Sequence, residues 1–109
     1  MNKLHDFPVM TADEAAAYIH NGATVGFSGF TAAGSAKALP MAIARKARNA
    51  EKEGTSFKIR MFTGASTGPF CDDAMAEAKA ISFRAPYQSS ALLRKQINAQ
   101  EVELSLIYL

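Results

Sequence analysis

The sequence predicts an α/β fold, with an open, mainly parallel sheet and helices on both of its faces. Three observations favour this class. Short apolar segments alternate with amphipathic ones, the apolar segments hold β-branched and aromatic residues, and two of them end in glycine-rich loops. Ligands bind such sheets at the carboxyl ends of the strands, so we expect a site at these loops, within a single domain over residues 1–109.

Helices and strands alternate along the whole chain. The predicted elements, in chain order, are a helix over residues 12–21, a strand over 23–27, a helix over 40–53, a strand over 57–62, a helix over 72–80, a strand over 81–83, a helix over 91–98 and a strand over 102–109. Strands joined by helices favour right-handed crossovers and therefore parallel pairing.

The first four elements have clear boundary signals. Thr11 and Glu14 form a capping box for the first helix, and an Asn-Gly pair ends it. The apolar, partly β-branched segment that follows is typical of a strand. Pro40 suits the first turn of the second helix and Gly54 ends it, after which residues 57–62 alternate and then become apolar, as in a strand that enters a buried sheet.

The later elements are bounded by proline and serine. Pro86 disfavours helix at Ala85, which ends the third strand and begins a loop. Ser89 or Ser90 can cap the next helix. The last strand becomes wholly apolar and reaches residue 109 without a polar tail, from which we expect a truncated chain.

Composition excludes several kinds of protein. The chain is 49% hydrophobic and 20% charged, as globular domains are, and its net charge of +2 is scattered, which argues against nucleic-acid binding. No apolar run reaches the roughly 20 residues of a membrane span, and no signal peptide begins the chain, so we expect a cytoplasmic protein without membrane contact. One cysteine and two unpartnered histidines predict neither a disulfide nor a metal site.

The first glycine loop is chemically ambiguous. Gly26, Gly29 and Gly34 would let backbone N–H groups approach an anion or a carbonyl oxygen. The loop matches neither the dinucleotide-binding pattern nor a phosphate-binding P-loop. Two interpretations stay open, an acyl-group or ligand site and a tight turn.

The second glycine loop, Gly64 to Gly68, satisfies the GxSxG pattern between a strand and a helix, as in the nucleophile elbow of serine hydrolases. Such an elbow needs a downstream histidine, and none follows His20. Ser66 therefore lacks a base in the usual order. A hydroxyl that binds substrate and a turn that caps a helix are the two favoured interpretations, and a serine nucleophile is a distant third.

The remaining polar candidates also have two interpretations each. Asp72 and Asp73 could act as a carboxylate pair, or favour the start of a helix electrostatically. Arg84 could reach a phosphate or carboxylate from a loop, or form a surface ion pair. For Cys71 we favour an idle thiol.

Four blocks run in order between about residues 9 and 102: TADEAAAYI, then GATVGFSGFTAAG with KALP behind it, then FTGASTGP, then FRAPYQSSALLRKQIN. In this order and spacing they resemble the N-terminal portion of the acetyl-CoA hydrolase/transferase family, which are class I coenzyme A transferases acting on acetate, succinate or propionate thioesters. The resemblance implies a chain several times longer, with an active site between two related α/β domains.

The resemblance also implies a mechanism. A glutamate attacks the acyl-CoA thioester, passes through an acyl anhydride and becomes a glutamyl-CoA thioester, which a second carboxylate resolves. That glutamate comes from a later part of the family's chain, so we expect no catalytic residue among these 109 and no activity of the isolated chain. Coenzyme A enters as a thioester substrate, with no further cofactor. The expected partners are acyl-CoA, a small carboxylate, the remainder of the enzyme or a second subunit, and further copies in a homo-oligomer.

The resemblance assigns substrate-binding positions to the glycine loops. They are Gly29, Phe30 and Thr31 in SGFTAAG, Gly64, which keeps its loop close, and the hydroxyl-bearing Ser66 and Ser89. The family often has threonine at the position of Ser89, and has aspartate and histidine where Leu106 and Tyr108 stand here. A non-catalytic acyl-CoA-binding domain or a subunit of a split assembly is the alternative.

Overall fold

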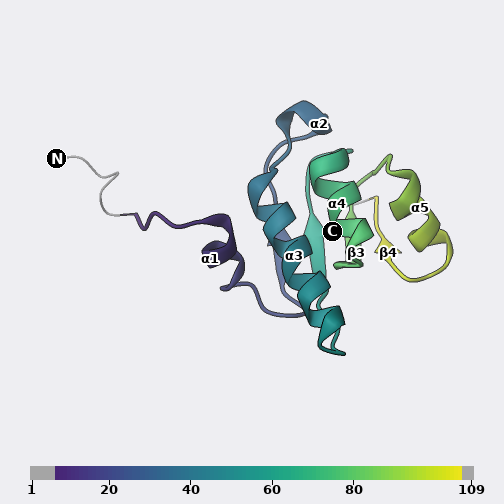
Figure 1. Cartoon of the computed structure of the whole chain (residues 1–109). Helices are drawn as coiled ribbons and strands as arrows, with labels where there is room; N and C mark the ends of the chain where they lie inside the picture. Colours follow the sequence, from purple (N-terminus) through teal and green to yellow (C-terminus); the bar gives the residue numbers. More distant parts are fainter. Residues whose placement is uncertain (1–6, 107–109) are drawn as a thin grey trace.

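The computed structural model describes residues 7–106 and confirms the predicted class, a parallel α/β sheet. The elements are α1 (Ala12–Ala16), β1 (Thr24–Gly26), α2 (Thr31–Gly34), α3 (Ala38–Lys52), β2 (Ile59–Phe62), the π-helix η2 (Pro69–Asp73), α4 (Ala74–Glu77), β3 (Ile81–Ala85), α5 (Ala91–Asn98) and β4 (Glu103–Leu104). The four strands lie in the order β1-β2-β3-β4. Figure 1 shows α2 beyond the strand ends, at the edge where the glycine loops leave the sheet.

The helices in the described part of the chain form one layer, whereas the sequence predicted helices on both faces. Helix α3 contacts α1 and α4, and α4 contacts α5 (Figure 1). Each strand lies next to its predecessor in the chain, and every new strand is added at the same end of the row of strands. Right-handed crossovers that all advance in one direction leave their helices on the same face, and covering the second face requires the strand order to reverse.

The two faces of the sheet differ accordingly. Ile59 and Met61 are fully buried in the core beneath the helices. On the opposite face Arg60 is exposed, and its guanidinium carbon lies 4.5 Å from the centre of the Phe83 ring. Phe62 continues this face, with its ring centre 5.3 Å from that of Phe83. A stacked cation and two aromatic rings therefore occupy the face that the described helices leave uncovered.

Helix α1 begins where predicted and ends five residues early. The capping box is present, with the Glu14 N–H donating to Thr11 Oγ1 at 3.1 Å and the Thr11 N–H donating to Glu14 Oε1 at 2.9 Å. This backbone hydrogen bond lowers the pKa of the Glu14 carboxyl. At the other end, the Lys46 ammonium donates to the carbonyls of Ala16 and Ile19 at 3.1 and 2.7 Å. A side chain distant in sequence thus donates to carbonyls at and just after the end of the helix.

Three later boundaries also differ from the prediction. The helix expected over residues 72–80 is the π-helix η2 followed by the single turn α4, and β3 extends two residues further, to Ala85. The strand expected over 102–109 is β4 alone among the described residues, because residues 107–109 lie outside them. No helix in residues 7–106 is long and apolar enough to cross a membrane.

Candidate functional site

Backbone hydrogen bonds join three loops at the carboxyl edge of the sheet. The Gly64 N–H donates to the Gly29 carbonyl, and the Thr31 N–H donates to the Ala65 carbonyl, both at 3.0 Å. The Ser66 N–H donates to the Tyr87 carbonyl, also at 3.0 Å. The two glycine loops and the loop after β3 therefore form one unit, which brings together every substrate-binding position that the sequence predicts.

Two of the glycines in these loops have no room for a side chain. A Cβ on Gly64 would collide with the Gly29 carbonyl oxygen and would lie 2.6 Å from Phe30 Cβ. A Cβ on Gly29 would collide with the Gly34 carbonyl, and Gly29 has a φ of +98°, which L residues rarely adopt. A side chain at Gly64 would push the two loops apart, and a side chain at Gly29 would force the first loop itself to open.

The hydroxyls of Ser66 and Ser89 meet between the second glycine loop and the loop after β3. Their Oγ atoms are hydrogen-bonded to each other, although the residues are 23 positions apart in the chain. Ser66 is half-buried and Ser89 is exposed, so the pair faces solvent on one side. Ser66 has a φ of +56° and Thr31 a φ of +58°, two left-handed conformations that surrounding contacts must maintain.

The arrangement around Ser66 does not support a serine hydrolase. Among residues 7–106 the one histidine is His20, which precedes β1 and lies at the amino edge of the sheet. Ser66 follows β2 and lies at the carboxyl edge. In the described part of the chain no imidazole is therefore placed to accept the Ser66 proton.

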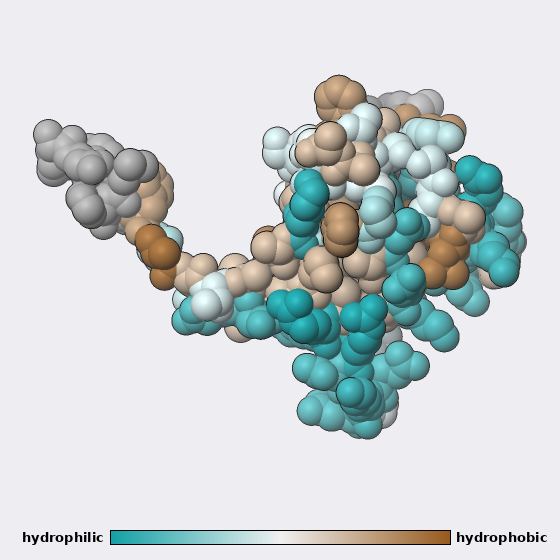
Figure 2. All heavy atoms as spheres, turned by 45° about the horizontal axis from the view of Figure 1, so that its top comes forward, coloured by the Kyte–Doolittle hydropathy of each residue, from teal (hydrophilic) through white to brown (hydrophobic). Residues whose placement is uncertain are grey.

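Two exposed aromatic side chains lie on the loops that are joined to the loop of Ser66. Phe30 is 65% exposed and Tyr87 is 53% exposed, and the backbones of both loops contact the loop of Ser66 and Gly64. Figure 2 shows this upper part of the molecule in pale and brown tones, in contrast to the hydrophilic far end of α3. Exposed apolar side chains thus lie on the loops next to that of Ser66, as expected where a small organic acid with a short apolar chain binds.

Arg84 and Asp72 form a buried ion pair that neither sequence interpretation described. Arg84 lies within β3 and donates from Nε to Asp72 Oδ1 at 2.8 Å and from Nη2 to Asp72 Oδ2 at 3.0 Å. The exposed fractions of the two side chains are 0% and 1%. An arginine that directly follows the apolar Phe83 in a short strand was the signal for a buried partner, and the prediction of a shorter strand placed Arg84 in a loop instead.

The other polar residues of η2 are also engaged. Asp73 accepts a hydrogen bond from the Ser90 hydroxyl, so Asp72 and Asp73 have separate partners and do not form a carboxylate pair. Cys71 is fully buried, and burial raises the pKa of its thiol. Within residues 7–106 no group of three or more histidine, cysteine, aspartate or glutamate side chains could hold a metal ion.

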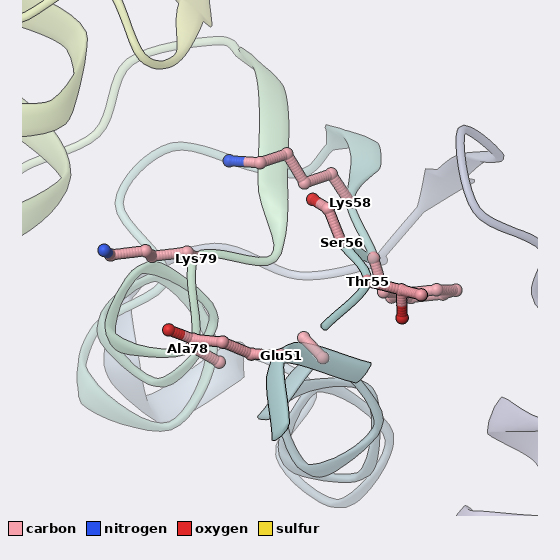
Figure 3. Close-up of a pocket in the computed structure, with 8 residues that line it drawn as sticks. Glu51, Thr55, Ser56, Lys58, Ala78 and Lys79 are labelled. Atoms are coloured by element: carbon pink, nitrogen blue, oxygen red, sulfur yellow. The ribbon is translucent and has the colours of Figure 1, made fainter. Parts of the chain in front are cut away.

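A cavity of about 190 Å³ lies at the opposite edge of the sheet (Figure 3). It is lined by residues that precede β2 and β3, together with the end of α3: Ala47, Glu51, Thr55, Ser56, Phe57, Lys58, Ala78 and Lys79. None of the predicted site residues lines it. The carboxyl-edge site is an open wall, and this cavity is not part of it.

Comparison with known proteins identifies the family of this chain. The family described as acetyl-CoA hydrolase/transferase N-terminal domain matches residues 2–109. The propanoyl-CoA:succinate CoA transferase of Escherichia coli is 49% identical over 100 residues, which are 92% of this chain and 20% of that protein. The succinyl-CoA:acetate CoA-transferase of Clostridium kluyveri is 41% identical over 101 residues, and the acetyl-CoA hydrolase of Saccharomyces cerevisiae is 37% identical over 97.

Coverage is unequal between this chain and its relatives. The yeast and clostridial matches take in 87% and 93% of this chain but 18% of either relative. The chain therefore spans about a fifth of the length of the curated relatives that it matches. Because the family matches nearly all of its residues, the chain belongs to the acetyl-CoA hydrolase/transferase family.

Proposed function

We propose that this chain forms the carboxylate-binding wall of an enzyme that moves coenzyme A between small carboxylic acids such as acetate, succinate and propionate. The observation that carries the proposal is the meeting of the Ser66 and Ser89 hydroxyls at the carboxyl edge of the sheet. A hydroxyl that donates to a carboxylate oxygen makes a charge-assisted hydrogen bond, stronger than one between neutral groups. Two adjacent hydroxyls can each serve one oxygen of the same carboxylate.

The proposal gives the neighbouring residues distinct roles. Gly64 lets the two loops approach and Gly29 lets the first loop fold back on Gly34, because neither position has room for a Cβ. Phe30 offers apolar surface to the acyl chain, and Thr31 offers a further hydroxyl from the same loop. These roles suit a substrate with one charged end and a short hydrocarbon part.

The covalent step is assigned to a glutamate outside these 109 residues. The two acidic residues of η2 already have partners, Asp72 in Arg84 and Asp73 in Ser90. The outside glutamate attacks the thioester carbonyl and expels the CoA thiolate. The resulting anhydride takes back CoA at the glutamyl carbonyl and releases the first acid, and a second carboxylate then reverses both steps. Coenzyme A is a substrate, and the proposal includes no further cofactor.

The proposal extends to the setting of the whole protein. The activities of the relatives, CoA transfer and acetyl-CoA hydrolysis, support a role in acetate metabolism. We infer a cytoplasmic enzyme in which the remainder of the protein, or a second subunit, faces this wall, and whose complete form is a homo-oligomer.

A chimaera tests the function directly. The matched 100 residues of the Escherichia coli relative are replaced by those of this chain, and succinyl-CoA formation from propanoyl-CoA and succinate is measured. We expect the chimaera to transfer CoA and the isolated chain to show no transfer, because removing a covalent nucleophile removes the whole route. A folded but inactive chimaera that still binds acyl-CoA would favour the non-catalytic binding domain. Transfer by the repurified isolated chain would contradict the outside glutamate.

Ser66→Ala in that chimaera should weaken carboxylate binding without abolishing the reaction. Loss of one hydrogen bond to a charged group costs roughly 1.5–3 kcal/mol, so we expect KM for succinate to rise about 10- to 100-fold while KM for propanoyl-CoA changes little. Ser56→Ala, an exposed serine at the opposite edge of the sheet, is the matched control. A loss of turnover by several orders of magnitude in folded protein would instead identify Ser66 as a nucleophile.

A further inference from the structure

We propose that the π-helix η2 positions the hydroxyl pair, with Asp72 and Arg84 holding the loop of Ser66 and Asp73 holding the loop of Ser89. The inference rests on the proposed function, because it gives these residues a role only through the two hydroxyls. Asp72, Asp73 and Arg84 are positioning residues here, since none of them is placed against substrate.

The Asp72–Arg84 pair ties both ends of the loop that carries Ser66. On one side, the Thr67 N–H donates to Asp72 Oδ2 at 2.9 Å, and the Asp72 N–H donates to Thr67 Oγ1 at 3.2 Å. On the other side, Arg84 Nη2 lies 3.5 Å from the Gly64 carbonyl oxygen. Ser66 lies between these two anchored positions, in the left-handed conformation that the sequence around it does not impose.

The next residue of η2 serves the second loop. Asp73 accepts a hydrogen bond from Ser90 Oγ, and the same oxygen accepts from the Leu93 N–H at 3.1 Å at the start of α5. Ser90 follows Ser89 directly, so Asp73 holds the backbone next to the second hydroxyl. Adjacent carboxylates on one helix therefore reach the two loops whose serines meet.

A charged pair suits positioning better than an apolar contact would. Burying two ions costs several kcal/mol of hydration, and well-packed apolar residues often replace such a pair without loss of stability. What apolar packing does not supply is direction: the two parallel hydrogen bonds between Arg84 and Asp72 fix the plane of the carboxylate, and with it the direction from which the Thr67 N–H approaches. A fixed loop keeps the Ser66 hydroxyl at one distance from Ser89.

The experiment measures coupling to Ser66 in the chimaera. Arg84→Lys keeps the charge but not the paired geometry, and Asp73→Asn keeps the size of the side chain. We expect either change to raise KM for succinate about tenfold, with little change in KM for propanoyl-CoA, because displacement of a binding group by a fraction of an ångström weakens its contact with substrate. Arg45→Lys alters an exposed ion pair with Asp13 and should leave both constants unchanged.

A merely structural role would give a different pattern. If Arg84 acts through Ser66, then Arg84→Lys should not raise KM for succinate further once Ser66→Ala is present, although it should lower Tm in both backgrounds. The inference would be overturned if Arg84→Lys raised KM for succinate equally with and without Ser66→Ala. A lower Tm with an unchanged KM for succinate would also overturn it. If Ser66→Ala itself leaves KM for succinate unchanged, the proposed function fails, and the two failures are thereby distinguished.

A second measurement covers variants that do not fold in the chimaera. In the 109-residue chain, NMR of Asp73→Asn should shift the amide resonances of Ser66 and Ser89, with Ser56 as the unperturbed reference. Unchanged Ser89 resonances in the folded variant would overturn the role of Asp73.

Discussion

Gly29→Ala is expected to destabilise the chain by about 2–5 kcal/mol, because two separate costs act at one position. The φ of +98° is a conformation in which a Cβ is strained, and that Cβ would also collide with the Gly34 carbonyl. The first loop would have to open, which also breaks the hydrogen bond from Gly64 to Gly29. Urea unfolding measures the loss, as a lower midpoint with an unchanged slope.

Two other glycines separate these costs. Gly22 has a φ of +85°, but a Cβ there would meet nothing within 4 Å, so Gly22→Ala should cost only about 1–2 kcal/mol. Gly26 has no left-handed φ, and a Cβ there would meet nothing within 4 Å. Gly26→Ala should therefore change stability by less than about 0.5 kcal/mol. Equal losses at Gly22 and Gly29 would show that the contact with Gly34 does not matter. In the chimaera, an unchanged kcat/KM in folded Gly29→Ala would show that the first glycine loop has a structural role and does not bind substrate.

Asp72→Ala is expected to destabilise the chain by about 3–5 kcal/mol, since it leaves the Arg84 guanidinium buried without its counter-ion. The Thr67 N–H loses its acceptor in the same variant. For a chain of this size such a loss should lower Tm by more than 10 °C or prevent folding, at about 4–8 °C for each kcal/mol. Thermal unfolding followed by circular dichroism measures the change.

The matched control is an ion pair of the same two residue types at the surface. Arg45 Nη2 lies 2.9 Å from Asp13 Oδ1, with exposed fractions of 49% and 68% for the two side chains. Asp13→Ala should cost about 1 kcal/mol or less, because water solvates the arginine that remains. Similar losses of stability in Asp13→Ala and Asp72→Ala would show that burial does not determine the cost of removing the carboxylate. Replacing both buried partners, in Asp72→Ala with Arg84→Met, should recover part of the stability.

Local signals in the sequence were sufficient for the fold class and for several boundaries. The capping box of Thr11 and Glu14 lies within one helical turn, and Gly54 has the left-handed φ of +83° expected of a helix stop. Such features depend on residues three or four positions apart, so they can be read from the chain directly. The alternation of helices and strands predicted the parallel sheet, because a helix between two strands returns the chain to the same end of the sheet.

Other outcomes depended on partners far apart in sequence. Helix α1 ends at Ala16, and the ammonium of Lys46, thirty residues later, binds the Ala16 carbonyl. Arg84 is buried because Asp72 faces it from η2, and periodicity cannot identify such a partner. The helices share one face because each strand is added to the same side of its predecessor, a choice that no local pattern records.

The candidate site, too, was predicted from the sequence only in part. The sequence by itself determined that two strands end in glycine loops, and the family resemblance singled out Ser66 and Ser89 for their hydroxyls. Only the tertiary structure decided that these hydroxyls touch, and that η2 contacts both of their loops. Propensities and caps act over a few residues, whereas the distance between two loops depends on the packing of every element between them.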